Sequence, residues 1–298
     1  MIITITIPFP KDWGIGEDTH SYLLKYDKGA LLIDTGLDCE ENRKLIKNKL
    51  RELNIKNLDY ILITHGHIDH FNLAKYLQEE TGAEILIHEY DGDLLKDYRN
   101  ALKWFDENYD LLIEGGYDEG ELKIIKNKML MVIEMLKMPE YYKTFKNLDL
   151  DLGNFKLKSI NLPGHTLGSV GYILENIIFS GDVAIEGTTV VENLRMEFNS
   201  LQKLKCFNYI FPAHKKTPLI RKDIEELERH FINRLEEILR ILKNGMRLRE
   251  MVNKIYGEEG QFRTILKLRN LLSYIKFLEE EGYVMKNGPL WISLKDEL

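Results

Sequence analysis

The segment "ITHGHIDHFN", residues 63–72, places four metal-ligand side chains within six positions: His65, His67, Asp69 and His70. Imidazole and carboxylate groups are ligands that suit Zn²⁺, and imidazole also suits iron. On a helix these four side chains would not share one face, whereas a loop that follows a strand can turn them all towards one point. Gly66 leaves room for the tight backbone that such a loop needs. The segment therefore predicts a metal site.

Three more candidate ligands occur downstream, each just after an apolar run typical of a strand. They are His165 in "LPGHTLGS", Asp182 in "FSGDV" and His214 in "FPAHK". Loops at the ends of strands are where sites are commonly built. Together with the first cluster, these residues make five histidines and two aspartates, enough for two metal ions with an open position between them. Three other histidines are interpreted as surface or core residues: His20, His88 and His230.

Strands alternating with helices must position these residues. Alternating or continuous apolar patterns predict strands at 2–7, 21–26, 30–35, 58–64 and 84–88. Helices are expected from Asp38, as the N-cap, to about residue 53, and over about 71–80. Strand patterns return at 155–162, 170–175, 177–182 and 209–214. The order predicts an α/β domain over residues 1–221, with the candidate ligands at strand ends.

A helical insertion is expected within this domain at about residues 89–148. Apolar residues there keep a 3.6-residue period, and the acidic stretch 106–121 is interpreted as a hinge between two helices. Six of its aromatic residues are candidates to line a pocket for an acyl group: Tyr98, Trp104, Phe105, Tyr109, Tyr141 and Tyr142. At least half of them are expected to serve packing alone.

A second domain is predicted over residues 222–298. Three amphipathic helices and a hairpin turning at Asn287-Gly288 give the element order of a winged-helix module. The third helix carries four basic residues that could form a small basic strip: Arg263, Lys267, Arg269 and Lys276. A solvated helix face is the favoured interpretation. We therefore expect this segment to serve mainly in packing, or as a dimer or lid element. A homodimer is left open.

Composition narrows the class of protein. The net charge of −7 argues against a protein whose main function is to bind nucleic acid, without excluding that function. No segment has the roughly 18 consecutive apolar residues of a membrane helix, and "MIITITIPFP" is unlike a signal peptide. Cys39 and Cys206 are too few for a disulfide scaffold. A cytoplasmic location and a small-molecule substrate are expected.

The motifs carry a family resemblance. "LLIDTG" (31–36), "THGHIDH", "GHTLGS", "SGD" and "PAH" resemble, in the same order, the successive motifs of the metallo-β-lactamase-fold superfamily over about residues 1–220. The resemblance implies an αββα sandwich with the site at one edge. It implies one metal on His65, His67 and His165 and a second on Asp69, His70 and His214. Asp182 would bridge the two, and Asp34 would be a structural aspartate.

The implied chemistry is hydrolysis by two divalent ions, zinc or a mixture of zinc and iron. A water between such ions has a pKa near 7, which gives hydroxide for attack on a carbonyl or phosphoryl centre. Asp69 would pass a proton to the leaving group. Asp182 and the form of "GHTLGS" most resemble the glyoxalase-II-like, or hydroxyacylglutathione-hydrolase-like, group, whose substrates are thioesters and other acyl compounds.

Three alternatives stay open at this point. Glyoxalase-like proteins with a winged-helix extension include endoribonucleases, so the first alternative is a metal-dependent nuclease or phosphodiesterase that acts on RNA. The second alternative is an enzyme similar to the persulfide dioxygenases, which use similar ligands around a single iron. The third is a binding or sensing module without important turnover, which the complete set of ligands argues against.

Overall fold

The computed structural model describes residues 1–11, 16–257 and 261–298, and side chains in the last range from residue 264 onwards. The contacts divide the chain into two compact units. The first, here called the sheet unit, consists of Met1–Asp97, Leu136–Thr189 and Met196–Leu227. The second, here called the helical unit, consists of Tyr98–Met135, Val190–Arg195 and Glu228–Leu298.

The sheet unit contains two mixed sheets. The first has its six strands in sequence order: β1 (Ile2–Ile7), β2 (Thr19–Tyr26), β3 (Gly29–Ile33), β4 (Tyr60–Leu62), β5 (Glu84–His88) and β6 (Lys143–Phe145). β1, β2 and β3 pair antiparallel, whereas β3 to β6 pair parallel. The parallel half therefore places the carboxyl ends of β3, β4 and β5 at one edge.

The second sheet has the order β11-β10-β9-β8-β7. Its strands are β7 (Asp149–Asp151), β8 (Lys156–Asn161), β9 (Val170–Leu174), β10 (Ile177–Gly181) and β11 (Tyr209–Pro212). β10 and β11 pair parallel, and the other pairs are antiparallel. β8 and β10 flank β9, so they run in the same direction and end at the same edge as β11.

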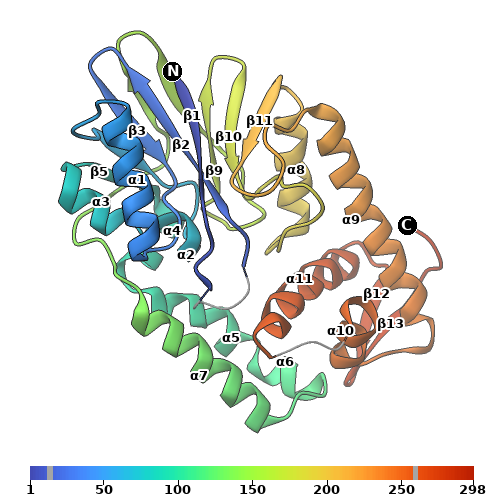
Figure 1. Ribbon diagram of the computed structural model, residues 1–298. Helices are drawn as coiled ribbons and strands as arrows, with labels where there is room; N and C mark the ends of the chain where they lie inside the picture. The colour runs from blue at the N-terminus through green and yellow to red at the C-terminus, as the bar shows by residue number, and fades with distance from the viewer. Residues whose placement is uncertain (12–15, 258–260) are drawn as a thin grey trace. The chain divides into compact units, whose positions relative to one another are not determined.

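The two sheets pack face to face around one apolar core. Tyr22 of the first sheet lies against Phe179 and Phe211 of the second, with ring centroids 4.9 and 5.6 Å apart. Leu31 and Tyr172, both fully buried, belong to the same cluster. Helices α1 (Glu40–Glu52) and α3 (Ala74–Thr81) lie outside the first sheet and α8 (Leu194–Leu204) outside the second (Figure 1). The predicted α/β sandwich with outer helices is confirmed.

Several predicted element boundaries are wrong. Asp38 does not cap α1, because the N-cap is Cys39 and Asp38 binds the Arg43 guanidinium through both oxygens at 2.5 Å. The helix expected over 71–80 is two helices, α2 (Ile68–Phe71) and α3. α2 begins inside the histidine cluster, so Asp69 and His70 lie on a short helix.

The segment 89–148 contributes to both units. α4 (Glu89–Lys96) and β6 lie in the sheet unit. The 3-10 turn Tyr98–Leu102 and the helices α5 (Lys103–Glu107), α6 (Tyr109–Glu114) and α7 (Glu119–Met135) lie in the helical unit. The stretch 106–121 is not a simple hinge, because it contains α6.

The helical unit combines this segment with the end of the chain. After α9 (Arg221–Ile241), which the two units share, come α10 (Leu248–Tyr256), α11 (Gln261–Glu280) and the hairpin β12–β13 (Val284–Asn287, Leu290–Ser293). Arg249 of α10 binds the Glu121 carboxylate of α7 at 2.8 Å. Asn287 pairs with Leu290, so the hairpin turns at residues 288–289, one position later than predicted.

Packing inside the helical unit uses side chains for which other roles were considered. Phe105 is buried, and Trp104 lies under the Arg269 guanidinium, which is also ion-paired with Glu192. Lys267 donates to two backbone carbonyls at the end of α10. The basic strip, which is the less favoured interpretation of these residues, is thus partly used in internal contacts, while the side chain of Arg263 lies outside the described residues. None of the helices in the described ranges is long and apolar enough to cross a membrane.

Candidate metal centre

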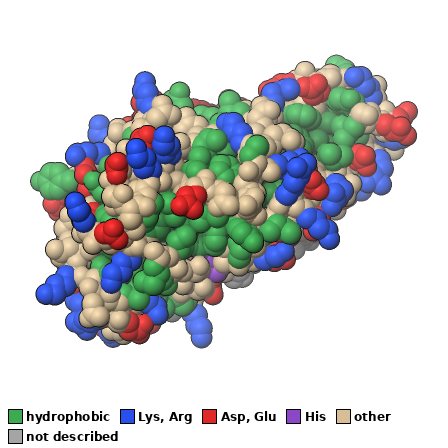
Figure 2. All heavy atoms as spheres, turned by 90° about the horizontal axis from the view of Figure 1, so that it is seen from above, with side chains coloured by type: hydrophobic (Ala, Val, Ile, Leu, Met, Phe, Trp, Pro, Cys, Tyr) green, Lys and Arg blue, Asp and Glu red, His purple; other side chains and the backbone are tan. Residues whose placement is uncertain are grey.

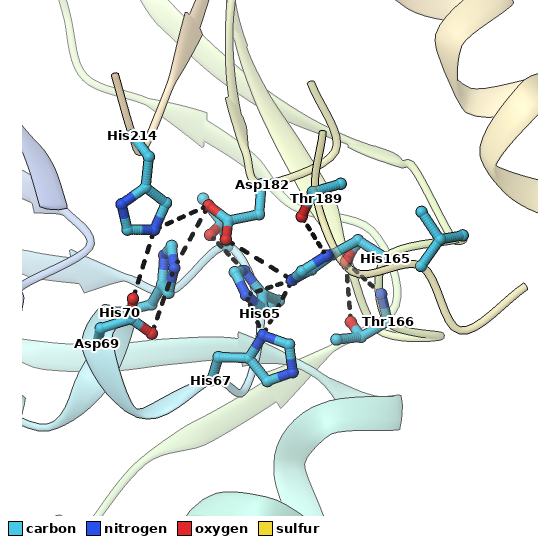
Figure 3. Close-up of polar contacts among 12 residues, drawn as sticks. His65, His67, Asp69, His70, His165, Thr166, Asp182, Thr189 and His214 are labelled. Carbon is cyan, nitrogen blue, oxygen red and sulfur yellow. Dashed lines mark hydrogen bonds and ion pairs between the residues drawn. The ribbon is translucent and has the colours of Figure 1, made fainter. Parts of the chain in front are cut away.

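The ends of strands from both sheets bring the seven predicted residues together (Figure 3). The segment of His65 to His70 follows β4, and His165, Asp182 and His214 follow β8, β10 and β11. Ligand atoms gather in three overlapping groups, within 4.8 Å of one another in each: His65, His67 and His165; His65, His70 and Asp182; Asp69, His70 and His214. The three histidines interpreted as structural are absent from these groups.

The first group is a triangle of imidazole nitrogens. His65 Nε2 and His67 Nδ1 are 3.0 Å apart, and His165 Nε2 lies 3.1 and 2.9 Å from them. The three ring planes are nearly perpendicular in pairs. Three nitrogens in mutual contact cannot all be satisfied by one another's protons, because a neutral imidazole carries a single N–H. A cation that accepts all three lone pairs fits this arrangement.

The group of Asp69, His70 and His214, from here on called the second group, joins two imidazoles and a carboxylate. His214 Nε2 lies 3.4 Å from Asp69 Oδ2, and His70 Nε2 lies 3.7 Å from Asp69 Oδ1. His70 Nε2 is buried and makes no hydrogen bond. A buried nitrogen without a hydrogen-bond partner is costly unless something else binds it. Asp69 is the most solvent-accessible carboxylate here, with 24% of its side chain exposed.

Asp182 lies between the two groups. Its Oδ1 is 3.3 Å from His214 Nε2 and 3.5 Å from His70 Nε2. Its Oδ2 is 3.8 Å from His165 Nε2, in the first group. Oδ1 is buried without a hydrogen-bond partner. One carboxylate therefore directs one oxygen to each group.

The outer ring nitrogens are held by neighbouring groups. His65 and His165 contact the hydroxyls of Thr64 and Thr189, each through Nδ1 at 3.1 Å. His70 Nδ1 lies 2.8 Å from Asp34 Oδ2, and His214 Nδ1 lies 2.8 Å from the carbonyl of Asp18. Such contacts fix the ring orientation and leave Nε2 facing the centre. The motifs indicated Asp34, but nothing in the sequence distinguished the others.

The pKa of His65 is shifted in the opposite direction from those of His70 and His214. Burial lowers the pKa of His65 well below its ordinary value, and the neighbouring imidazoles reinforce this. Burial also opposes protonation of His70 and His214, but Asp182 and the other carboxylates outweigh it and raise their pKa values to about 10 and about 12. Burial raises the pKa of Asp182, yet His214 and His70 outweigh it and hold that pKa well below its usual range.

These shifts predict proton release when metal binds to the metal-free protein. At about pH 7.5 His70 and His214 carry protons, which the second metal must displace, whereas the neutral His65 has none to lose. We expect about two protons released per chain, measured by titration calorimetry in buffers of different ionisation enthalpy. Binding enthalpies that do not depend on the buffer would contradict this.

The same shifts set the pH dependence of the metal-free fold. Because both folded-state pKa values are raised above the ordinary 6.5, the stabilisation from these two histidines is complete below about pH 6.5. It is lost as the pH rises through the folded values of about 10 and about 12. Thermal unfolding of the metal-free protein should therefore shift to lower temperature between neutral and alkaline pH.

Two buried carboxyl groups near the site had no sequence signal. Asp91 of α4 is 3% exposed and contacts the loops that carry His65 and His165. Glu197 of α8 is fully buried beside the His165 loop, and burial raises its pKa well above the ordinary value. Acidic residues are common in the first turns of helices, so neither stood out.

The comparisons with known proteins agree with this geometry. The family model described as "Metallo-beta-lactamase superfamily" matches residues 14–228. The beta-lactamase-like protein 2 homolog of Caenorhabditis elegans is 26% identical over 284 residues, 90% of this chain and 81% of that protein. The hydroxyacylglutathione hydrolase GloC of Haemophilus influenzae is 29% identical over 165 residues, 54% of this chain and 64% of that protein.

A solved structure shares the fold along almost the whole chain. The metallo-beta-lactamase family protein from Thermus thermophilus superposes with a TM-score of 0.81 at 22% identity, covering 98% of each chain. The family model, which spans most of the chain, and the gathered histidines and aspartates lead to one conclusion. The chain belongs to the metallo-β-lactamase superfamily and is a metal-dependent hydrolase of that fold with a histidine and aspartate metal-binding cluster.

Proposed function

We propose that the protein hydrolyses a small acyl substrate, a thioester, lactone or related ester, with two divalent metal ions. The observation that carries this proposal is the position of Asp182, whose two oxygens point to separate groups of histidines. A site for a single ion would need only one of these groups.

In this proposal every ligand comes from the residues predicted from the sequence. His65, His67 and His165 hold the first ion; Asp69, His70 and His214 hold the second; and Asp182 binds both. His70 Nε2 and Asp182 Oδ1 are buried and make no hydrogen bond, as expected of atoms that bind a cation. A set of nitrogen and oxygen ligands suits zinc, iron or one ion of each. Two such ions supply Lewis acidity to the substrate carbonyl and activate water at neutral pH.

Asp69 is proposed to move a proton to the leaving group. Its carboxylate lies at the centre, and it is more exposed than Asp182, so an oxygen can reach both the centre and substrate. Burial raises its pKa, but His70 and His214 outweigh this effect and hold the pKa below its usual range, so the group is an anion in the metal-free protein.

Asp69→Asn should lower kcat about 100-fold, because the amide cannot carry the proton. The loss should be largest for substrates whose leaving group needs protonation and small for an activated aryl ester. Steady-state kinetics with both substrate types would measure this, alongside metal content. A variant that keeps both metals and full activity on both substrates would contradict the proton role.

Charge supports a small substrate over RNA. Basic and acidic side chains are interspersed on the face seen in Figure 2, without an extended basic area among the side chains drawn there. In the helical unit Arg269 is ion-paired with Glu192, and Lys267 donates a hydrogen bond to a backbone carbonyl at the end of α10. Nucleic-acid modules usually present a clear basic surface. The relationship to a hydroxyacylglutathione hydrolase also supports an acyl substrate.

The end of the chain is proposed to be a winged-helix-like module. α9, α10 and α11 followed by the β12–β13 hairpin have the element order of such a module. Within the unit, Met246 and Trp291 bind each other's backbone, which joins the hairpin to the segment before α10. We propose a packing role for this module rather than RNA binding.

The test combines metal content with a substrate panel. The purified protein should contain close to two zinc, or zinc and iron, per chain, and hydrolyse thioesters or lactones until a chelator removes the metal. His67→Ala should lose this activity, whereas the matched control His230→Ala, a histidine outside the site, should keep it. Cleavage of RNA alone, or one iron per chain with oxygen uptake, would overturn the proposal.

A further inference from the structure

Asp91 connects the two loops that supply the first group of histidines. Its Oδ2 accepts hydrogen bonds from the Gly66 backbone N–H at 2.7 Å and the Thr166 hydroxyl at 2.9 Å. Its Oδ1 accepts from the Gly168 N–H at 3.0 Å. Gly66 lies between His65 and His67, and Thr166 directly follows His165. One carboxylate therefore binds the backbone or side chain next to all three imidazoles.

The packing around Asp91 is too close for larger residues. A Cβ atom built on Gly168 would lie 2.3 Å from Asp91 Oδ1. A Cβ atom on Gly66 would lie 2.5 Å from Leu94 Cδ1 and 3.3 Å from the Asp91 Cβ. The two glycines thus let α4 approach both loops directly. A backbone hydrogen bond from the Val170 N–H to the Thr64 carbonyl, at 3.0 Å, also joins the two segments.

The chemistry of the three contacts requires a carboxylate. All three partners donate, and an ionised carboxylate is the side chain of this size that only accepts. Asparagine would present an NH₂ group towards at least one of these donors. Asp91 is 3% exposed, so water cannot replace a lost partner easily.

We propose that Asp91 is a positioning residue that sets the spacing of His65, His67 and His165 and thereby the affinity of the first metal site. This inference rests on the proposed two-metal function. Asp91 contacts none of the metal-facing nitrogens and acts through the loop backbone. Loss of such outer contacts lowers metal affinity about 10- to 100-fold, and here the loss should fall on the first site alone.

The experiment measures metal binding without substrate. Metal-loaded wild type, Asp91→Asn and Asp91→Ala are titrated with a chelator, and the zinc that stays on each chain is counted. In both variants we expect one zinc to leave at about 10- to 100-fold lower chelator concentration than in wild type, while the other leaves as before. Asp38→Asn, which alters a buried carboxylate bound to Arg43, serves as the matched control and should retain both ions like wild type.

Each result is decisive for one of the two proposals. If the wild type binds two zinc ions and Asp91→Asn releases both as the wild type does, the positioning role is overturned and the proposed function stands. A purely structural role would lower the unfolding temperature and leave the affinities of the two sites unchanged. If the wild type itself binds no second metal, the proposed function fails first. Should Asp91→Ala fail to fold, Asp91→Asn alone carries the test.

Discussion

Asp182→Ala is expected to remove bound metal from both sites and to lower kcat/KM about a thousandfold or more. The carboxylate faces His70 and His214 through one oxygen and His165 through the other. Its removal takes away a ligand from each proposed ion. A metal contributes several kcal/mol of transition-state stabilisation, and about 4 kcal/mol corresponds to a thousandfold in rate.

Ser180→Ala is the matched control for this variant. Ser180 lies on β10, the strand that Asp182 follows; it is 1% exposed, and its hydroxyl makes no hydrogen bond. Removing an unpaired hydroxyl should be nearly neutral, so this variant should keep both metals and full activity. Metal analysis and steady-state kinetics of the two variants provide the comparison. Activity within tenfold of wild type in Asp182→Ala, with both metals bound, would refute the bridging role.

The site could be predicted from the sequence because its residues follow apolar strands. "LDYILIT" and "IIFSG" are largely apolar runs, and each is followed at once by polar residues capable of binding metal. Strands that run in the same direction in one sheet end at the same edge, so residues placed in this way gather at one edge of each sheet. The face-to-face packing of the two sheets then brings together residues such as His65 and His165, which lie a hundred positions apart. For these residues the local sequence pattern and the order of the strands both place the candidate ligands at the site.

The residues that support the site could not be predicted in this way. Asp91 lies in an ordinary helical pattern, and only the folded chain shows that it faces two loops 100 residues apart. Thr189 lies in a segment without periodicity. β6 and β7 have three residues each, too few for an alternating pattern to be recognised.

Long-range contacts also decide which segments form the helical unit. The ion pairs Arg249–Glu121 and Arg269–Glu192 join residues far apart in the sequence. Charged residues at these positions look like any solvated helix face until their partners are known. The grouping of residues 98–135 with the end of the chain is therefore a property of the tertiary structure.

Asp34→Ala is expected to have the largest effect on stability. Asp34 is 1% exposed and accepts hydrogen bonds from the Thr64 N–H and hydroxyl, each at 2.8 Å, and contacts His70 Nδ1 at 2.8 Å. Alanine leaves these groups buried without a partner, and breaking a buried charged network costs about 3–5 kcal/mol. Calorimetry of the metal-free protein should show unfolding roughly 10 °C lower than in wild type.

The same substitution should weaken the second metal site, because His70 is no longer held by its outer nitrogen. Asp38→Ala separates the two effects: it removes a carboxylate whose side chain is only 5% exposed and is bound to Arg43, and it should cost stability while keeping both metals. Asp34 also has a φ of 55°, a conformation that asparagine tolerates better than alanine. Asp34→Asn should therefore lose less stability than Asp34→Ala but share its metal defect. Equal metal retention in the Asp34→Ala and Asp38→Ala variants would show that Asp34 stabilises the fold without orienting His70.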